Sequence, residues 1–573
     1  MSHSPTDRVR AAYRRIAEAD RPEVWITLCH EHDLLVAAKE IEDRLAGGEQ
    51  LPLAGLVVAV KDNIDVAGLP TTAACPSYAY TPSDSATAVR RLTDAGALVL
   101  GKTNLDQFAT GLVGTRSPYG AVRHAHLPER ISGGSSSGSA VAVALGIADL
   151  ALGTDTAGSG RVPAALHGLV GLKPTLGLVP NTGVVPAARP YDCVTVFAAT
   201  LTLAQRGIAV LTGPDPLDPR SRTWPDSVRL AAGAHPRVAV PDAAGLAPLS
   251  TGASAAFHAA AERLRAGGAV VEAIDIRPFL TAATLLYEGA LVAERYAAVG
   301  EFIDSRVGRD RVDDGIDPTV AGIILAAKQL PAYRLAADLE LLDRHRATAA
   351  AALAGFDALL LPTTTGHPTL AEVRAEPVAV NSRMGVYTNF VNLLDMAAVA
   401  VPAGTADGGP FGVSVITRAF DDQIGIDIAA LLTGEQADVP LPPTGIDLAV
   451  FGAHLRGHPL NGELTGLGAR FAGTVATAPA YRMVALPTEP PKPGVLRVAA
   501  GGAALPGERW TLSPAALGRF LAGLPAPMSL GLIELDDGGT VLGFHCNSVA
   551  AEAGVDITHH GGWPAYLASA PVR

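Results

Sequence analysis

Residues 132–161 read SGGSSSGSAVAVALGIADLALGTDTAGSGR, an apolar stretch between two turns of small residues. The first turn, at 132–139, is rich in Gly and Ser, and a helix-like apolar run starts at Ala140. A Gly-rich turn that enters a helix can bind an anion through its free backbone N–H groups. Because no Gly-Lys-Ser/Thr closes this turn, we exclude a nucleotide-binding loop. The second turn, at 153–161, has small residues on both sides of Ser159, so a substrate can approach the backbone closely.

Short apolar runs lie on both sides of this stretch and are separated by Ala-rich helical segments. The run at 56–60 leads into Lys61, the run at 97–100 leads into polar residues, and others lie at 237–240, 269–271 and 358–361. Alternating buried strands and helices predict an α/β fold, with a central mixed sheet covered by helices on both faces. The first fifty residues are predicted to be helical, at 8–19 and 34–45, as a surface layer or a partner-contacting arm.

The chain has 573 residues, too many for one hydrophobic core, since such cores stop growing near about 250–300 residues. The Pro-rich segment 435–447 is a candidate linker. We therefore predict one domain over residues 1–443, including the helical N-terminal segment, and a second over residues 444–573. The second part has short strand-like runs between Gly and Pro turns, and a β-hairpin is predicted around Asp537-Gly538-Gly539.

Composition excludes several classes of function. The net charge is −12 and no long basic run occurs, which argues against nucleic acid as a partner. The longest apolar stretches are broken by Asp and Gly, so we predict no membrane span, and the N-terminus lacks the apolar region of a secretory leader. The four cysteines are widely spaced, which predicts a reducing, cytoplasmic location and neither disulfides nor a metal site; no cofactor is expected.

Ser159 needs a neighbouring base, because a serine hydroxyl is a poor nucleophile at its own pKa. His124, His126 and His167 are near in sequence, but none has the spacing of a known triad. A buried, neutral lysine is the alternative base, since desolvation lowers its pKa, and Lys61 follows a predicted strand. The opposing interpretation makes Lys61 a surface lysine and the Ser-rich loop a flexible turn.

Four motifs together resemble the amidase-signature family: VAVKDNID, GGSSSGSA, LALGTDTAGSGR and GLVGLKPT. The resemblance covers roughly residues 50–440. It implies that Ser159 is the nucleophile, that Ser135 bridges it to Lys61, and that Lys61 is the base. It also implies an oxyanion hole made of the backbone N–H groups of four consecutive residues, Thr156, Ala157, Gly158 and Ser159. The family more often has Gly where Ala157 stands, but the N–H donor is retained.

The segment at 388–404 and three C-terminal stretches resemble the allophanate hydrolase branch of that family, whose appended domain has a γ-glutamylcyclotransferase-like β-barrel fold. This resemblance implies a small anionic substrate, allophanate, held by Tyr287 and Arg295. These residues lie eight apart, so on one helix both would project from the same face. Gly111 is a weaker candidate for close backbone contact with the substrate. Arg161 is expected to hold the nucleophile turn.

The same resemblance places a second step, decarboxylation of the first product, in the C-terminal domain, with His559 as acid or base. His560 is a close competitor, and the alternative is that His559 is a packed structural histidine. Three other interpretations stay open: a general small-amide amidase or an amidotransferase subunit with a non-catalytic, partner-binding C-terminal domain, and a catalytically idle scaffold. The resemblance also suggests a homodimer.

Overall fold

The computed structural model describes residues 4–306, 315–435, 440–442, 445–489 and 491–569. The chain folds into two compact units. The first contains residues 1–223 and 235–441, and the second contains 224–234 and 442–573. The boundary predicted between residues 443 and 444 lies outside the described residues. The sequence did not predict that residues 224–234 join the second unit.

A mixed sheet of eleven strands, in the order β1-β3-β2-β4-β6-β5-β10-β11-β9-β7-β8, forms the centre of the first unit. Strands β2, β3 and β4 run parallel, as do β7, β8 and β9, and the remaining pairs are antiparallel. This confirms the predicted mixed sheet. The strands are β1 (Trp25–Leu28), β2 (Val57–Lys61), β3 (Leu98–Thr103), β4 (Leu150–Asp155), β5 (Val170–Lys173), β6 (Cys193–Ala198), β7 (Arg237–Pro241), β8 (Val270–Ile274), β9 (Ala358–Pro362), β10 (Met396–Ala406) and β11 (Gly409–Arg418).

The central strands consist mostly of apolar residues, because both of their faces are covered. Every residue of β2, β3 and β4 is buried, as expected for parallel strands between helical layers. The five apolar runs predicted as strands all form strands, and they correspond to β2, β3, β7, β8 and β9. The sequence pattern therefore located five of the eleven strands correctly.

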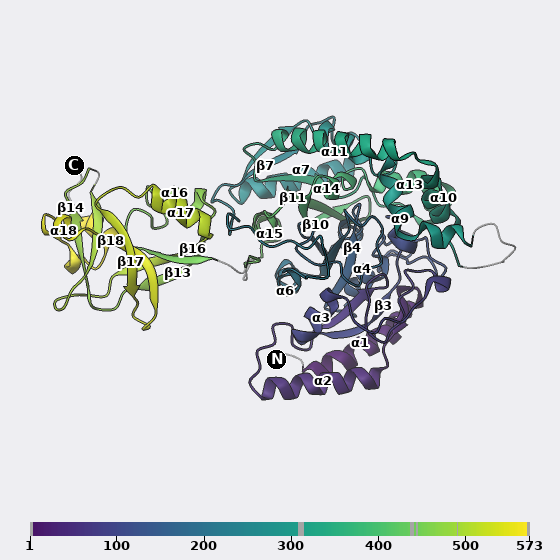
Figure 1. Cartoon of the computed structure of the whole chain (residues 1–573), viewed down its shortest axis with the longest axis horizontal. Coiled ribbons are helices and arrows are strands. Elements are labelled where there is room, and N and C mark those ends of the chain that lie inside the picture. Colours follow the sequence, from purple (N-terminus) through teal and green to yellow (C-terminus); the bar gives the residue numbers. More distant parts are fainter. Residues whose placement is uncertain (1–3, 307–314, 436–439, 443–444, 490, 570–573) are drawn as a thin grey trace. The chain divides into compact units, whose positions relative to one another are not determined.

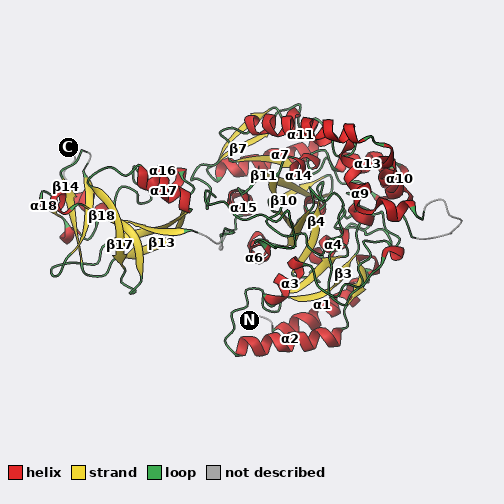
Figure 2. Cartoon of the chain, viewed as in Figure 1, coloured by secondary structure: helices red, strands yellow, loops and turns green. Residues whose placement is uncertain are grey.

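Helices cover the sheet of the first unit on both faces, as Figure 2 shows. Helices α1 and α2 lie side by side near the N-terminus (Figure 1). The helices are α1 (Pro5–Ala19), α2 (Glu31–Ala46), α3 (Thr87–Asp94), α4 (Ser137–Ala144), α5 (Arg161–His167), α6 (Leu201–Leu211), α7 (Thr251–Ala266), α8 (Arg277–Thr284), α9 (Ala293–Asp304), α10 (Pro318–Ala326), α11 (Ala332–Ala352), α12 (Leu370–Ala375), α13 (Pro377–Met384), α14 (Asn389–Leu393) and α15 (Asp422–Thr433).

The N-terminal fifty residues are not wholly helical. The two predicted helices are present as α1 and α2, but Trp25–Leu28 forms strand β1, which pairs antiparallel with β3 at one edge of the sheet. The segment is therefore part of the first unit's sheet and core rather than a detached arm. Val9, Ala12 and Ala38 are fully buried in that core.

The second unit is rich in β-structure, as predicted. A five-stranded sheet has the order β13-β16-β12-β18-β17, and a three-stranded sheet has the order β15-β14-β19. Strands β17 and β18 form the hairpin predicted around residues 537–539. The elements are β12 (Ile446–Val450), α16 (Asn461–Gly466), β13 (Arg470–Ala476), β14 (Tyr481–Leu486), β15 (Lys492–Arg497), β16 (Pro506–Leu512), α17 (Pro514–Ala522), β17 (Met528–Glu534), β18 (Thr540–Cys546), α18 (Ser548–Glu552), β19 (Val555–Asp556) and α19 (Trp563–Ser569).

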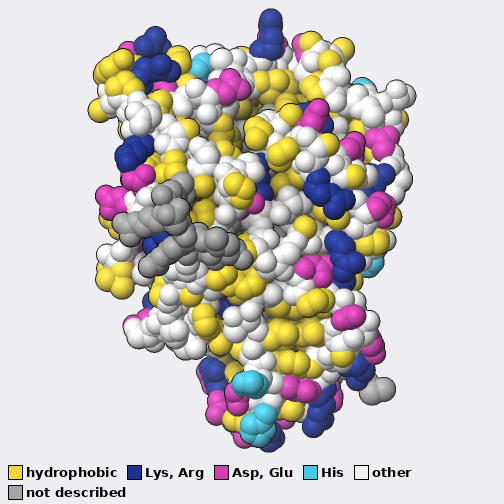
Figure 3. Space-filling view, turned by 90° about the vertical axis from the view of Figure 1, so that its right-hand side faces the viewer, with side chains coloured by type: hydrophobic (Ala, Val, Ile, Leu, Met, Phe, Trp, Pro, Cys, Tyr) yellow, Lys and Arg dark blue, Asp and Glu magenta, His cyan; other side chains and the backbone are white. Residues whose placement is uncertain are grey.

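The surface carries charges of both signs. On the face drawn in Figure 3, basic and acidic side chains are interspersed, and neither sign gathers into one continuous patch among the residues described there. This distribution agrees with the absence of a long basic run in the sequence. None of the described helices combines the length and the hydropathy that a membrane span requires.

Candidate active site

The candidate catalytic residues lie near the ends of two parallel strands, β2 and β4. Lys61 is the last residue of β2 and Asp155 is the last residue of β4, and these strands pair in register through Val60 and Leu152. Because parallel strands end at the same edge of a sheet, the turns that follow them share one space. The turn containing Ser135 leads into α4, and the turn containing Ser159 leads into α5.

Lys61 contacts Ser135 directly. Its Nζ lies 2.7 Å from Ser135 Oγ and 2.7 Å from Thr154 Oγ1, and 3.5 Å from the Thr154 carbonyl oxygen. All three residues are buried. A neutral amine has two N–H donors and one lone pair, so two bonds to Thr154 would direct the lone pair at the Ser135 hydroxyl.

Burial lowers the pKa of Lys61 to about 7. Desolvation is the largest cause, because it penalises the ammonium form, and it outweighs the negative charges of Asp106, Asp155 and Asp192, which act in the opposite direction. The positive charge of Arg295 lowers the pKa further. Lys61 can therefore exchange a proton near neutral pH, as a general base must.

Ser159 lies in a tight turn whose backbone needs a glycine. Gly158 has φ +130°, and a Cβ there would collide with the side chain of Thr388. Ser159 is 2% exposed, and its hydroxyl makes no hydrogen bond to any described residue. Nothing in the described part of the chain joins Ser135 to Ser159 by a direct hydrogen bond, so the link between them stays a prediction.

The turn also presents backbone N–H groups, but not all four that were predicted. The Gly158 N–H already donates to Asp155 Oδ1 at 2.9 Å. The N–H groups of Thr156, Ala157 and Ser159 have no acceptor among the described residues. These three are therefore the donors that a ligand could use.

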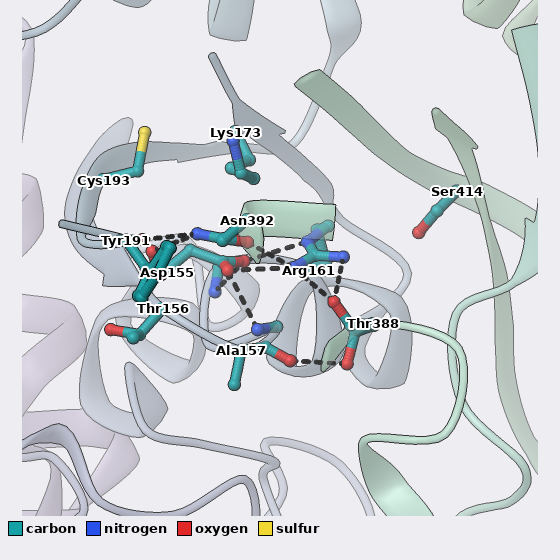
Figure 4. A network of polar contacts seen from close by, with 12 residues as sticks. Asp155, Thr156, Ala157, Arg161, Lys173, Tyr191, Cys193, Thr388, Asn392 and Ser414 are labelled. Atoms are coloured by element: carbon teal, nitrogen blue, oxygen red, sulfur yellow. Dashed lines mark hydrogen bonds and ion pairs between the residues drawn. The ribbon is translucent and has the colours of Figure 1, made fainter. Parts of the chain in front are cut away.

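A network of buried polar side chains clamps this turn, and Figure 4 shows it. Arg161 pairs with Asp155 through Nε and Nη2, at 3.0 and 2.9 Å, and its Nη atoms also reach the Thr388 carbonyl oxygen at 3.2 Å. Burial by itself would raise the pKa of Asp155, but the Arg161 guanidinium holds it below its ordinary value. The expectation that Arg161 is structural agrees with these contacts.

Residues from 388–392 complete the clamp. Thr388 Oγ1 donates to the Ala157 carbonyl oxygen at 2.6 Å. Asn392 Nδ2 donates to the carbonyl oxygens of Asp155 and Tyr191, at 2.8 Å each. The segment that precedes β10 therefore fixes both ends of the nucleophile turn.

The histidines near Ser159 in sequence form a separate cluster behind α5. The rings of His124 and His167 stack 4.2 Å apart, and His367 packs edge-on to His124. His124 Nε2 donates to the Leu166 carbonyl oxygen, and His167 Nδ1 donates to that of Pro163. These contacts occupy the rings, so the cluster supports the helix that follows Ser159 and supplies no base to it.

Tyr287 and Arg295 meet, although not on one helix as predicted. Tyr287 lies in a turn after α8, whereas Arg295 lies in the first turn of α9, and a 3-10 helix at Ala290–Val292 separates them. Arg295 Nη2 nevertheless donates to Tyr287 Oη at 2.8 Å, and Nη1 donates to Thr110 Oγ1 at 2.9 Å. The turn at residues 285–289 brings the two side chains together, so their contact does not result from their spacing along one helix.

Arg295 is an unusual charge for a protein interior. It is 2% exposed, its Nε has no hydrogen-bond partner, and no carboxylate in the described part of the chain pairs with it. Burying an unpaired charge is costly, so such a group normally has a partner. Arg295 is therefore placed to bind an anion.

Gly111 follows Thr110 and lies against Asp106. A Cβ at Gly111 would come within 2.5 Å of Asp106 Oδ2. Packing alone therefore explains the glycine, and its contact with a substrate stays a prediction. Among the described residues, no three His, Cys, Asp or Glu side chains are arranged to hold a metal ion.

His559 lies in the second unit and is exposed. Its ring packs beside His560, which contacts Ser569 Oγ at 3.1 Å through Nδ1. Neither histidine lines the cavity of about 660 Å³ that this unit contains. The geometry does not favour His559 as an acid or base.

That cavity contains a different histidine, which the sequence analysis did not single out. His454 Nε2 lies 3.0 Å from Glu463 Oε2, and the His454 ring stacks on Phe544. Burial lowers the pKa of His454, although Glu463 opposes this. Lys492 and Arg519 also line the cavity. The signal in the sequence was a histidine just after a buried strand, within VFGAHLRG at 450–457.

Thr154 was missed as well. It lies one residue before the end of β4, next to the strand that ends in Lys61. A hydroxyl at the end of a strand that neighbours a buried lysine is a signal that the strand order, once known, would have revealed. The sequence alone did not give that order.

Two family models match the chain. The amidase family matches residues 7–424, and the allophanate hydrolase C-terminal domain matches residues 446–568. The chain is similar to the solved structure of Kluyveromyces lactis allophanate hydrolase, with a TM-score of 0.89 and 38% identity, covering 99% of this chain and 97% of that one.

Two curated relatives differ in what they cover. Urea amidolyase of Saccharomyces cerevisiae is 42% identical over 95% of this chain, which spans 31% of that protein's length. One subunit of the glutamyl-tRNA(Gln) amidotransferase of Symbiobacterium thermophilum is 36% identical over 74% of this chain and 92% of its own length. The chain thus spans about a third of the urea amidolyases it matches.

Proposed function

Because the chain belongs to the amidase family and carries an allophanate hydrolase C-terminal domain, we propose that it hydrolyses allophanate to ammonia and carbon dioxide. One observation carries the choice of substrate: the buried Arg295 contacts two hydroxyls and has no carboxylate partner within the described chain. Allophanate is a urea bearing a carboxylate on one nitrogen. Its carboxylate would neutralise Arg295, and Tyr287 would donate to it or accept from its N–H.

The first step uses the residues at the strand ends. Ser159 Oγ attacks the terminal amide carbonyl carbon, and its proton passes through Ser135 to neutral Lys61. The ammonium of Lys61 then returns a proton to the departing nitrogen through the same hydroxyl. The C–N bond breaks, ammonia leaves, and the acyl group stays on Ser159. A water molecule activated by Lys61 through Ser135 then hydrolyses this ester and releases N-carboxycarbamate.

The oxyanion of each tetrahedral intermediate would be held by the free N–H groups of Thr156, Ala157 and Ser159. Donors that are fixed before the reaction stabilise the developing charge without reorganising. The clamp of Arg161, Thr388 and Asn392 supplies that rigidity. Arg161 pairs with Asp155, and Thr388 and Asn392 donate to carbonyl oxygens of the turn.

The second step is the loss of carbon dioxide from N-carboxycarbamate, and we assign it to the cavity of the second unit. Lys492 and Arg519 would attract a small dianion, and His454, paired with Glu463, is placed to deliver the proton that replaces a departing carboxylate. This replaces His559, which lies outside the cavity. The competing role for the second unit is assembly alone.

Ammonia release from allophanate, measured against a panel of small amides, tests the first step. Ser159→Ala should abolish release while leaving the unfolding temperature unchanged, since the Ser159 side chain makes no hydrogen bond to a described residue. Turnover near that of the wild type in this variant would remove Ser159 as the nucleophile. Equal turnover of neutral amides and allophanate would favour a general amidase.

The two products separate the two steps. His454→Ala should leave the first equivalent of ammonia intact while carbon dioxide release slows to the rate of the free product in solution. His559→Ala is the matched control and should change neither yield. Slower carbon dioxide release in His559→Ala but not in His454→Ala would favour His559 as the acid or base. Unchanged carbon dioxide release in both variants would favour a second unit that serves only assembly.

A component of an amidotransferase is the other candidate, since one subunit of glutamyl-tRNA(Gln) amidotransferase is similar to part of this chain. That similarity covers 74% of the chain, whereas the similarity to the allophanate hydrolase structure covers 99%. Glutaminase activity in place of allophanate hydrolysis would support it.

We also infer a cytoplasmic homodimer. The four cysteines are free, in keeping with a reducing compartment. The dimer rests on the family resemblance, and light scattering on purified protein tests it.

A further inference from the structure

Asp106 lies in the buried segment between β3 and the 3-10 helix at Gln107–Ala109. Its carboxylate accepts three backbone N–H groups, from Val113 at 3.2 Å, Gly114 at 2.9 Å and Arg116 at 2.9 Å. A carboxylate with this many backbone donors fixes the loop that supplies them. Asp106 therefore organises residues 111–116.

Asp106 also contacts Ser135, the serine that the proposed mechanism places between Ser159 and Lys61. The Asp106 backbone N–H donates to the Ser135 carbonyl oxygen at 3.1 Å. Its carboxylate also packs so closely on Gly134 that a Cβ there would overlap Oδ2, and Gly111 meets the same oxygen. Two glycines of the site thus exist to make room for one carboxylate.

Asp106 is also connected to the anion-binding arginine. After it, Phe108 and Ala109 take left-handed backbone conformations, with φ +49° and +52°, and Thr110 then accepts from Arg295 Nη1 at 2.9 Å. The loop closes back on this point, because Arg116 Nη1 donates to the Thr110 carbonyl oxygen at 2.9 Å. Ser135 and the partner of Arg295 are therefore held by one residue.

Four charged groups act on the Lys61 amine from the elements around it. Asp106, Asp155 and Asp192 favour its ammonium form, and Arg295 disfavours it, with Asp106 the largest of the four. Asp155 is neutralised by Arg161, and Asp192 accepts from Thr156 Oγ1 at 2.5 Å. Asp106 has no cationic partner among the described residues, so its charge stays available to Lys61.

We propose that Asp106 is a positioning residue for this reaction. Its backbone N–H holds the Ser135 main chain, and its carboxylate holds the loop that closes on Thr110. Its charge favours the ammonium that Lys61 becomes when it takes the proton of Ser159. The proposal deepens the proposed hydrolysis and rests on it. Asp106 acts through Ser135, Lys61 and Arg295 and need not touch the substrate.

The test substitutes Asp106→Asn and follows two readouts: kcat and KM for allophanate, and the pH dependence of Ser159 labelling by a fluorophosphonate. Loss of the negative charge makes the Lys61 ammonium less stable, so the pKa of Lys61 falls. The acid limb, which is the part of the pH profile where the labelling rate rises with pH, therefore moves to lower pH. Loss of one acceptor loosens the loop, so kcat for allophanate falls by about tenfold or more.

Asp149→Asn is the matched control. The Asp149 carboxylate accepts from the Val57 N–H at 2.9 Å and pairs with Arg8, so it holds the opposite end of β2 from Lys61. A purely structural loss would appear in both variants as a lower unfolding temperature. Only Asp106→Asn should move the acid limb. A limb and a kcat in Asp106→Asn that both match the wild type would overturn the proposal.

Gly111→Ala covers the case in which Asp106→Asn does not fold. The added methyl group would displace the carboxylate but leave its charge, so kcat should fall while the acid limb stays in place. Unchanged kcat would overturn the positioning role. Labelling does not need allophanate, so a wild type that is labelled but does not turn over allophanate would refute the proposed function and still allow the role of Asp106 to be tested.

Discussion

Lys61 is the proposed base, and its burial sets its pKa. Because burial lowers its pKa to about 7, the neutral, active form becomes populated as the pH rises through neutrality. We expect the rate of Ser159 acylation to rise with pH along a limb centred near this value. Fluorophosphonate labelling between about pH 5 and pH 9 measures it.

The control for this profile is Lys61→Met, which keeps the length of the side chain and removes the titrating group. Labelling of that variant should be slow at every pH. A wild-type rate that does not change over the whole range would mean that another group takes the proton.

We expect Arg295 to carry the preference for an anionic substrate. Replacing it with Gln leaves donors for Tyr287 and Thr110 but removes the positive charge. We expect KM for allophanate to rise on the order of 10- to 100-fold, since a charged hydrogen bond contributes about 1.5–3 kcal/mol. A small neutral amide should lose much less. Steady-state kinetics with both substrates decides, and equal losses would place Arg295 away from the carboxylate.

At this scale the family resemblance placed Lys61 next to Ser135, and the two side chains do meet. Their catalytic roles stay predictions. Thr154 and Asp106 were missed because their roles arise from strand pairing and a folded loop, which local patterns do not encode. The hydrogen bond from the Gly158 N–H to Asp155 could not be predicted from the sequence for the same reason.

Helix α5, which follows Ser159, packs with histidines that burial keeps neutral. Burial lowers the pKa of His124 to about 4, lowers that of His367 to about 4, and lowers that of His167 well below its ordinary value. His124 Nδ1 accepts from the N–H groups of His126 and Leu127, so a proton there would face two donors. The folded state thus resists protonation that the unfolded chain accepts.

The sign of the pH effect follows from that difference. Below the ordinary histidine pKa of about 6.5 the unfolded chain binds more protons than the folded one, so stability is lost as the pH falls toward 4. We expect the unfolding temperature of the first unit to drop steeply in this range. His124→Gln should flatten the slope, and an unchanged slope would remove the cluster as the cause.

Two elements show where periodicity misleads. A spacing of eight predicted one helix for Tyr287 and Arg295, but Gly289 lies between them in an extended conformation and the chain turns there. Strand β1 was missed because four residues between two helices give too short a pattern to read. Both errors concern connections, where tertiary contacts decide.

The two units are interwoven along the chain, because residues 224–234 belong to the second unit. Val228 and Leu230 are buried, and the Leu230 N–H donates to the Gly468 carbonyl oxygen at 2.9 Å. A fragment that ends at residue 441 would therefore expose both side chains. We expect this fragment to aggregate more than the same fragment with Val228→Ser and Leu230→Ser, as measured by light scattering.

The same two substitutions in the full chain are the control. There they remove buried contacts and should destabilise the second unit by a few kcal/mol. If the fragment is equally soluble with and without them, residues 224–234 contribute little to the second unit.

The early position of residues 224–234 in the chain also affects how the protein folds while it is being synthesised. The segment leaves the ribosome roughly two hundred residues before the rest of its unit. At the usual pace of translation, it waits on the order of ten seconds or more for its partners. During that interval the first unit must complete its sheet while the apolar side chains of residues 224–234 are still exposed to solvent. A pause in elongation between residues 234 and 441 should therefore lower the yield of active enzyme, whereas an equal pause before residue 224 should not.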